Sequence, residues 1–154
     1  MKRKIFFIAS IIFILDQIVK FTVDIHLLKE IVIVDNFFSL YKVYNTGVAF
    51  SFFAGSIYFI ILINIIILIF LIKYLKNFKK NLRNTIAFGL TLGGLCGNLI
   101  DRILYGHVID YFKLFYKEYT FPIFNIADIA LTTGIVLIIY AVFKKEDEYG
   151  INSK

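Results

Sequence analysis

Four long apolar segments alternate with shorter mixed segments along the chain. A helix needs about 20 apolar residues to cross the hydrocarbon core of a bilayer. Each of the four segments has about that length, and they occupy residues 5–23, 53–72, 85–104 and 125–143. The pattern therefore predicts an all-α membrane protein in which residues 1–154 form a single integral-membrane domain with four transmembrane helices.

The two mixed connections at residues 25–52 and 105–124 are expected on the same side of the membrane. Residues 31–34 and 40–45 combine β-branched, aromatic and charged side chains around an Asp-Asn turn signal, which predicts short strands and a small sheet. The stretch 105–122 is rich in Tyr and Phe, side chains that are favoured at headgroup depth. We expect this stretch to lie along the membrane surface.

Composition and charge exclude a large soluble domain. Of the 154 residues 60% are hydrophobic, against about 45–50% in soluble domains. The net charge of +6 does not indicate a nucleic-acid partner, because most of the 17 Lys and Arg residues gather near the two termini and between the second and third apolar segments. By the positive-inside rule both termini are cytoplasmic and the mixed connections are extracytoplasmic. The acidic residues 146–148 are interpreted as a solvated tail.

Metal and disulfide chemistry are not expected. Cys96 is the single cysteine, and the two histidines, His26 and His107, are far apart in the sequence. A Cys/His zinc cage, a zinc protease and an intrachain disulfide framework are therefore disfavoured. No metal or organic cofactor is predicted.

Charged residues inside apolar segments need partners, because each costs about 2.5–3.5 kcal/mol at a helix centre. Asp16 and Lys20 share one helix face at i, i+4 spacing. They form either a structural ion pair or a direct contact to substrate. A serine-lysine hydrolase using Lys20 with Ser39 or Ser51 is disfavoured, because Asp16 already satisfies Lys20.

The third apolar segment has small residues on one face and polar residues near its outer end. Glycines at 89, 93 and 97 repeat every four residues, which favours close helix packing. Asp101 and Arg102 point in different directions and should reach different neighbours. Together with Asn98 they are expected to form a network that braces an active site.

Asp110 and Asp128 are the strongest candidates for chemistry. Asp110 follows the third apolar segment and Asp128 lies near the start of the fourth, so both fall at the outer membrane depth. Two carboxyls in a partly dry site do not both ionise easily; one stays protonated while the other acts as a general base toward water. The alternative is that Asp128 is a helix N-terminal acid and Asp110 an exposed turn residue.

Two further functions remain open from the residues alone. A small proton-coupled membrane transporter would also use intramembrane acids, although no acidic ladder leads from Asp110 and Asp128 toward the cytoplasm. A non-catalytic lipid-binding subunit would keep the polar network but would need no water between the carboxylates.

Five motifs together resemble the lipoprotein signal peptidases, a family of four-span bacterial aspartyl proteases also called signal peptidase II. They are Asp16-Gln17 with Lys20, residues 45–51, residues 93–102, residues 108–112 and residues 124–128. The match covers nearly the whole chain. A departure is Phe121 before Pro122, where family members often have tryptophan; this chain has none.

The resemblance implies an aspartic endopeptidase that cuts lipid-modified bacterial prolipoproteins just before the diacylglyceryl-cysteine. It also implies a small extracytoplasmic β-cradle and an interfacial loop helix over the active site. Expected partners are the prolipoprotein and membrane lipid, the expected location is the bacterial cytoplasmic membrane, and a monomer is expected. The resemblance makes Asp110 and Asp128 catalytic and assigns substrate-binding or supporting roles to Asn45, Gly47, Asn98, Asp101, Arg102, Asn125, Ala127, Asp16 and Lys20.

Overall fold

Four apolar helices form the body of the protein. The computed structural model describes residues 1–47 and 56–147. Within them, each of the four helices is long and apolar enough to cross a membrane. They are α1 (Lys2–His26), α2 (Ile57–Tyr74), α3 (Leu82–Tyr105) and α4 (Ile126–Phe143), and the short 3-10 helix η2 (Leu75–Asn77) follows α2. The predicted four-helix architecture is confirmed.

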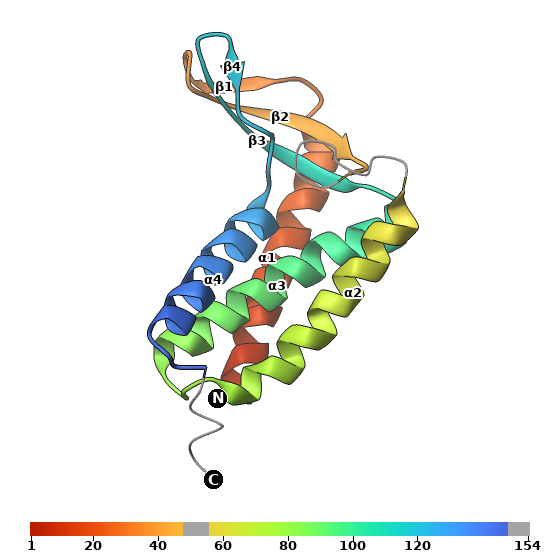
Figure 1. Ribbon diagram of the computed structural model, residues 1–154. Helices are drawn as coiled ribbons and strands as arrows, with labels where there is room; N and C mark the ends of the chain where they lie inside the picture. The colour runs from red at the N-terminus through yellow and green to blue at the C-terminus, as the bar shows by residue number, and fades with distance from the viewer. Residues whose placement is uncertain (48–55, 148–154) are drawn as a thin grey trace.

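A small antiparallel sheet lies across the end of the bundle opposite the N-terminus (Figure 1). Its strands are β1 (Ile31–Val34), β2 (Phe38–Asn45), β3 (Val108–Tyr116) and β4 (Tyr119–Thr120), in the order β1-β2-β3-β4. The β2–β3 register pairs Asn45 with Val108 and Val43 with Asp110. The sheet therefore brings the two connections between helices together, although they are far apart in the sequence.

The β1–β2 hairpin is confirmed, and the second connection contains two strands that the sequence did not predict. Residues 108–116 and 119–120 of the aromatic stretch are strands of the same sheet, and the place of this stretch along the membrane surface stays a prediction. The aromatic side chains lie on both faces of β3, so this strand lacks the alternation of apolar and polar residues by which a half-buried strand is predicted. Apart from the ends of α1 and α3, no helix occurs among the described residues of the two connections, so the interfacial loop helix that the resemblance implies is not found among them. Residues 48–55, which carry part of the second motif, lie outside the described residues.

Helix α3 is the central helix, and its glycines allow the neighbouring helices to approach closely. A Cβ on Gly93 would lie 2.8 Å from the carbonyl oxygen of Ala9 on α1, and a Cβ on Gly94 would overlap the carbonyl oxygen of Ala127 on α4. A Cβ on Gly97 would lie 2.6 Å from Oδ2 of Asp16. The glycine face thus sets the spacing of α1, α3 and α4, as small residues do in membrane bundles.

Glu146 ties the end of α4 to the start of α3. Its carboxylate accepts from Arg83 Nη2 at 2.5 Å and from the Nδ2 atoms of Asn81 and Asn84 at 2.9 Å each. Asp147 accepts from the Tyr74 hydroxyl at 3.0 Å. The interpretation of these acidic residues as a solvated tail is wrong for both, and residue 148 lies outside the described residues.

Replacing Glu146 by Gln is expected to lower the melting temperature in detergent by a few degrees at pH 7. The hydrogen bonds, above all that from Arg83, lower the pKa of Glu146 from 4.5 to about 2. A carboxylate with a lowered folded-state pKa stabilises above its ordinary pKa, and its contribution disappears as the pH falls toward the lowered value. The difference from the unsubstituted protein should therefore shrink by pH 3. Glu118→Gln, at an exposed turn, is the matched control; equal melting temperatures for Glu146→Gln and the unsubstituted protein at pH 7 would contradict the assignment.

Candidate active site

Asp110 lies on β3, where its carboxylate faces the bundle. It is 3% exposed, and its two oxygens accept from Asn125 Nδ2 at 2.7 Å and from Asn45 Nδ2 at 2.8 Å. Burial, and then the nearby charge of Asp128, raise the pKa of Asp110 from 3.8 to about 7, against the opposing effect of the two amide donors. Asp110 therefore takes up a proton more readily than an ordinary carboxyl does.

Asp128 lies in the first turn of α4 and closes a capping box with Asn125. The backbone N–H of Asn125 donates to Asp128 Oδ2 at 3.0 Å, and the backbone N–H of Asp128 donates to Asn125 Oδ1 at 2.9 Å. The other carboxylate oxygen of Asp128 accepts from Asn98 Nδ2 at 2.7 Å. Asn125 thus contacts both carboxylates and links β3 to α4.

Both carboxylates open onto one cavity of about 630 Å³. Its polar lining includes Asn45, Asn98 and Arg102, and most of the rest is apolar. A pair of acids in such a cavity can hold one proton between them, so that one carboxyl polarises a carbonyl group and the other takes a proton from water. The arrangement suits hydrolysis of an amide bond.

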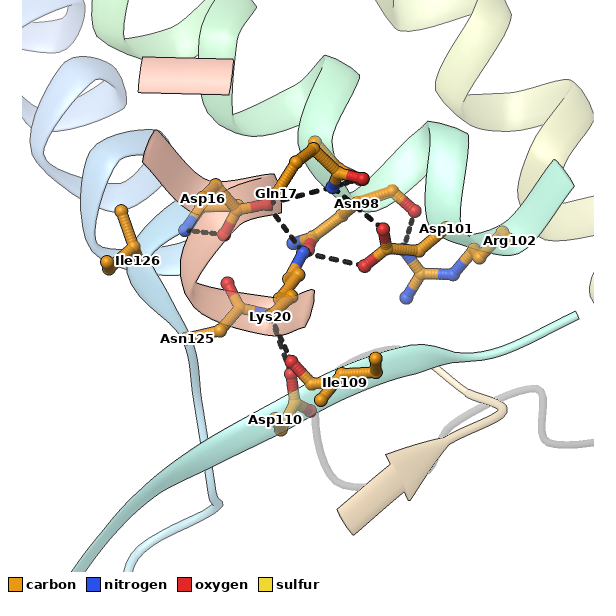
Figure 2. A network of polar contacts seen from close by, with 12 residues as sticks. Asp16, Gln17, Lys20, Asn98, Asp101, Arg102, Ile109, Asp110, Asn125 and Ile126 are labelled. Atoms are coloured by element: carbon orange, nitrogen blue, oxygen red, sulfur yellow. Dashed lines mark hydrogen bonds and ion pairs between the residues drawn. The ribbon is translucent and has the colours of Figure 1, made fainter. Parts of the chain in front are cut away.

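A buried ion cluster lies behind this cavity, between α1 and α3 (Figure 2). Lys20 Nζ is 2.7 Å from Asp16 Oδ2, 2.7 Å from Asp101 Oδ2 and 2.9 Å from Asn98 Oδ1. Gln17 Nε2 donates to Asp101 Oδ1 at 2.8 Å. The predicted ion pair between Asp16 and Lys20 is present, and Lys20 has no contact with Ser39, which donates to Glu30 instead.

Two further interactions connect this network to the backbone around the cavity. Asp16 Oδ1 accepts from the Ala127 N–H at 2.9 Å, which fixes the start of α4 against α1. Arg102 donates from Nη2 to the Gly47 carbonyl at 2.8 Å and from Nη1 to the Asn98 carbonyl at 3.1 Å. Asp101 and Arg102 therefore reach different neighbours, as their positions on the helix predict.

All eleven candidate residues named from the sequence lie in this connected network of hydrogen bonds and ion pairs. The alternative interpretation of Asp110 as an exposed turn residue is wrong, because Asp110 is buried in a strand. The alternative interpretation of Asp128 as a helix N-terminal acid is correct, because one of its carboxylate oxygens caps α4. Its other oxygen remains directed to Asn98, so capping and a place at the cavity are compatible.

Sequence reasoning missed two residues of this region. Asn64 of α2 is not among the residues that the motifs indicate, but it lines the main cavity. Gln17 was noted only as part of a motif, although it joins Asp101 to the ion cluster. A single amide in an otherwise apolar run is the signal that could have identified Asn64. Among the described residues no group of three or more His, Cys, Asp or Glu could hold a metal ion.

Comparison with known proteins gives one consistent result. A family model described as signal peptidase (SPase) II matches residues 8–144. The chain is 43% identical over 138 residues to a lipoprotein signal peptidase of Janthinobacterium sp. (strain Marseille), covering 86% of this chain and 84% of that protein. It is 37% identical over 147 residues to a lipoprotein signal peptidase of Pseudomonas aeruginosa, covering 90% and 87%.

Solved structures agree with the sequence relatives. The fold is similar to a bacterial membrane enzyme solved by the in meso method at 2.3 Å resolution, with a TM-score of 0.80 and 36% identity over 94% of this chain and 89% of that one. A second bacterial membrane enzyme, solved by the same method at 1.9 Å, has a TM-score of 0.79 and 35% identity, covering 94% of each chain.

Proposed function

The chain belongs to the signal peptidase II family of membrane-embedded aspartic peptidases, and we propose that it removes the signal peptide from lipid-modified prolipoproteins by cutting just before the diacylglyceryl-cysteine. The observation that carries the proposal is the pair Asp110 and Asp128. Both line one cavity, and both accept a hydrogen bond from Asn125. In this proposal the two carboxyls share one proton and activate water as a unit.

The environment of the pair supports attack by water on a peptide bond. The ionised carboxyl takes a proton from water as the water oxygen bonds to the scissile carbonyl carbon, and the protonated carboxyl donates a hydrogen bond to the carbonyl oxygen, which becomes the oxyanion. The proton taken from water then passes to the leaving nitrogen as the C–N bond breaks. The resulting oxyanion needs donors nearby, and the amides of Asn45 and Asn98 and the guanidinium of Arg102 line the same cavity. These groups can also satisfy substrate backbone groups that lose their helical partners during unwinding in the membrane.

The mostly apolar lining of the cavity supports a lipid-modified substrate. Two acyl chains on the cysteine would remain in lipid, since transfer of each CH₂ group into water costs about 0.8 kcal/mol. The peptide segment before the cysteine would then enter the cavity between Asp110 and Asp128. No metal or organic cofactor takes part in the proposed reaction.

The distribution of basic residues supports an orientation with both termini in the cytoplasm and the cavity toward the extracytoplasmic face. Reporter fusions or cysteine labelling at residues 80 and 118 test this orientation. Labelling by a membrane-impermeant reagent from outside is expected at residue 118 and not at residue 80. The reverse result would contradict the orientation.

The substrate class is tested with two synthetic precursor peptides that differ only in the diacylglyceryl group. We expect purified protein to cut the lipidated peptide before its cysteine and to cut the unlipidated peptide at least about 100-fold more slowly, because the lipid binding energy positions the scissile bond. Mass spectrometry of the products gives the cut position and the rate. Equal rates would contradict lipid recognition, and absence of cleavage of both would contradict the proposed function.

A further inference from the structure

Two of the three asparagines around the carboxylates have an orientation that the backbone dictates. The Gly47 N–H donates to Asn45 Oδ1 at 2.9 Å, and the Asp128 N–H donates to Asn125 Oδ1 at 2.9 Å. A backbone N–H cannot accept a hydrogen bond, so the carbonyl oxygen of each amide must face it. The NH₂ groups of both asparagines are therefore directed to Asp110.

The third asparagine, Asn98, has the same arrangement, but a side chain dictates it. Lys20 Nζ donates to Asn98 Oδ1 at 2.9 Å, and Asn125 Nδ2 donates to the same oxygen at 3.2 Å. An ammonium group has three donors and no acceptor. Lys20 therefore holds the oxygen of Asn98 toward itself, and Nδ2 of Asn98 faces Asp128 at 2.7 Å.

We propose that Lys20 is a positioning residue that fixes the orientation of the Asn98 amide, so that this amide donates to Asp128. The inference deepens the proposed function and rests on it, because it assigns Lys20 a task at the same pair of carboxylates. Lys20 is 2% exposed and is absent from the described lining of the main cavity. Besides the effect of its charge on both carboxylates, Lys20 acts on the chemistry through Asn98.

An Asn98 amide turned by 180° would place two acceptors, Oδ1 of Asn98 and Oδ1 of Asp128, against each other. That contact is repulsive when Asp128 is ionised and becomes a hydrogen bond when Asp128 carries a proton. The other charged or titratable groups facing Asp128 are Asp110 and Tyr111 on β3, Arg102 on α3 and Lys20 on α1. A turned amide therefore shifts the shared proton toward Asp128 and disturbs the division of roles between the two carboxyls.

The test combines the double variant Lys20→Gln/Asp101→Asn, which keeps the net charge of the cluster, with the variant Lys20→Arg, which keeps the cation near the two carboxylates, and it reads the Asn98 orientation directly by NMR. The unsubstituted cluster of Asp16, Lys20 and Asp101 has a net charge of −1, and so does the double variant, in which only Asp16 is charged. A glutamine at position 20 can accept as well as donate, so the shorter of the two contacts that hold Asn98 Oδ1 no longer dictates its orientation, and only the 3.2 Å contact from Asn125 Nδ2 remains. We expect kcat to fall about 100-fold, KM to change less than about threefold, and the acidic limb of the pH–kcat profile to move up by about one pH unit.

Two variants serve as controls. Lys20→Arg keeps a cation that only donates, and it is expected to retain a higher kcat than the double variant and the unsubstituted pH profile. Lys42→Gln removes a lysine that pairs with Asp24 at the rim and leaves the active site intact, so its activity is expected to stay unchanged. Melting temperatures establish that each variant is folded.

A readout independent of cleavage is the side-chain NH₂ resonance of Asn98 in protein labelled with ¹⁵N-asparagine. In the unsubstituted protein this resonance should shift as the pair of carboxylates titrates, and in the double variant the shift should be lost; Asn84, at the opposite end of α3, is the internal control. A folded double variant with unchanged kcat and pH profile, or with an Asn98 resonance that still titrates, overturns the inference. If the unsubstituted protein cuts no lipidated peptide, the proposed function fails and the resonance alone decides the orientation.

Discussion

Replacing either Asp110 or Asp128 by Asn is expected to lower the rate of lipidated-peptide cleavage by at least about 10⁴-fold, as removal of a catalytic group does in other proteases. Asparagine has nearly the same shape as aspartate but can neither take a proton from water nor share one with its neighbour. The measurement is product formation under single-turnover conditions. Activity of either variant within tenfold of the unsubstituted protein would contradict the roles proposed for the two carboxyls.

Folding controls are essential for these two substitutions, because each carboxylate also has structural partners. Asn at position 128 retains an oxygen that can accept from the Asn125 N–H, so the α4 cap survives. The matched control is Asp24→Asn, which removes a rim carboxylate that binds Lys42 and Tyr44 and is absent from the described lining of the main cavity. This variant is expected to keep its cleavage activity, and all three variants are expected to elute as folded protein.

The second large effect is expected from Gly94→Ala. The added Cβ would overlap the carbonyl oxygen of Ala127 and lie 2.9 Å from the backbone nitrogen of Leu131. Backbone atoms cannot turn aside as a side chain can, so α4 must move away from α3. Because Asp128 directly follows Ala127, we expect a loss of about 3 kcal/mol in stability and a fall in activity of at least about 100-fold.

Gly106→Ala provides the contrasting control for this prediction. No atom lies within 4 Å of a Cβ at Gly106, but its φ of 73° is left-handed. The expected cost is about 1 kcal/mol of conformational strain without displacement of α4. Unfolding in mixed micelles with increasing SDS gives both free-energy differences. If Gly94→Ala is as stable and active as the unsubstituted protein, close packing of α3 on α4 is not required.

The sequence predicts the helices well because the requirements of a bilayer are simple. Uninterrupted apolar length specifies α2 and α4, and the glycine repeat correctly predicts close packing around α3. The ion pair between Asp16 and Lys20 in α1 is also predictable, since either charge alone would be costly in hydrocarbon. The residues alone leave a transporter and a non-catalytic subunit open as alternatives. Membership of the signal peptidase II family decides for a peptidase.

The sheet and the cavity lining are less predictable because they depend on contacts between distant segments. Strand β3 has aromatic residues on both faces, so it lacks the alternation of a half-buried strand. Asp110 becomes buried only when β3 pairs with β2 and Asn45 comes within reach. Likewise, the single amide of Asn64 in an apolar run marks the residue, but its place in the cavity lining depends on how α2 packs.

The most direct test of the central claim is a crystal structure with a lipidated peptide in which a statine-type secondary alcohol replaces the scissile amide. Its hydroxyl imitates the oxygen of the tetrahedral intermediate. The account predicts this hydroxyl within about 3.2 Å of a carboxylate oxygen of Asp110 and of one of Asp128, the distance at which a proton can pass. A bound analogue whose hydroxyl contacts only one of the two carboxylates, or neither, would contradict it.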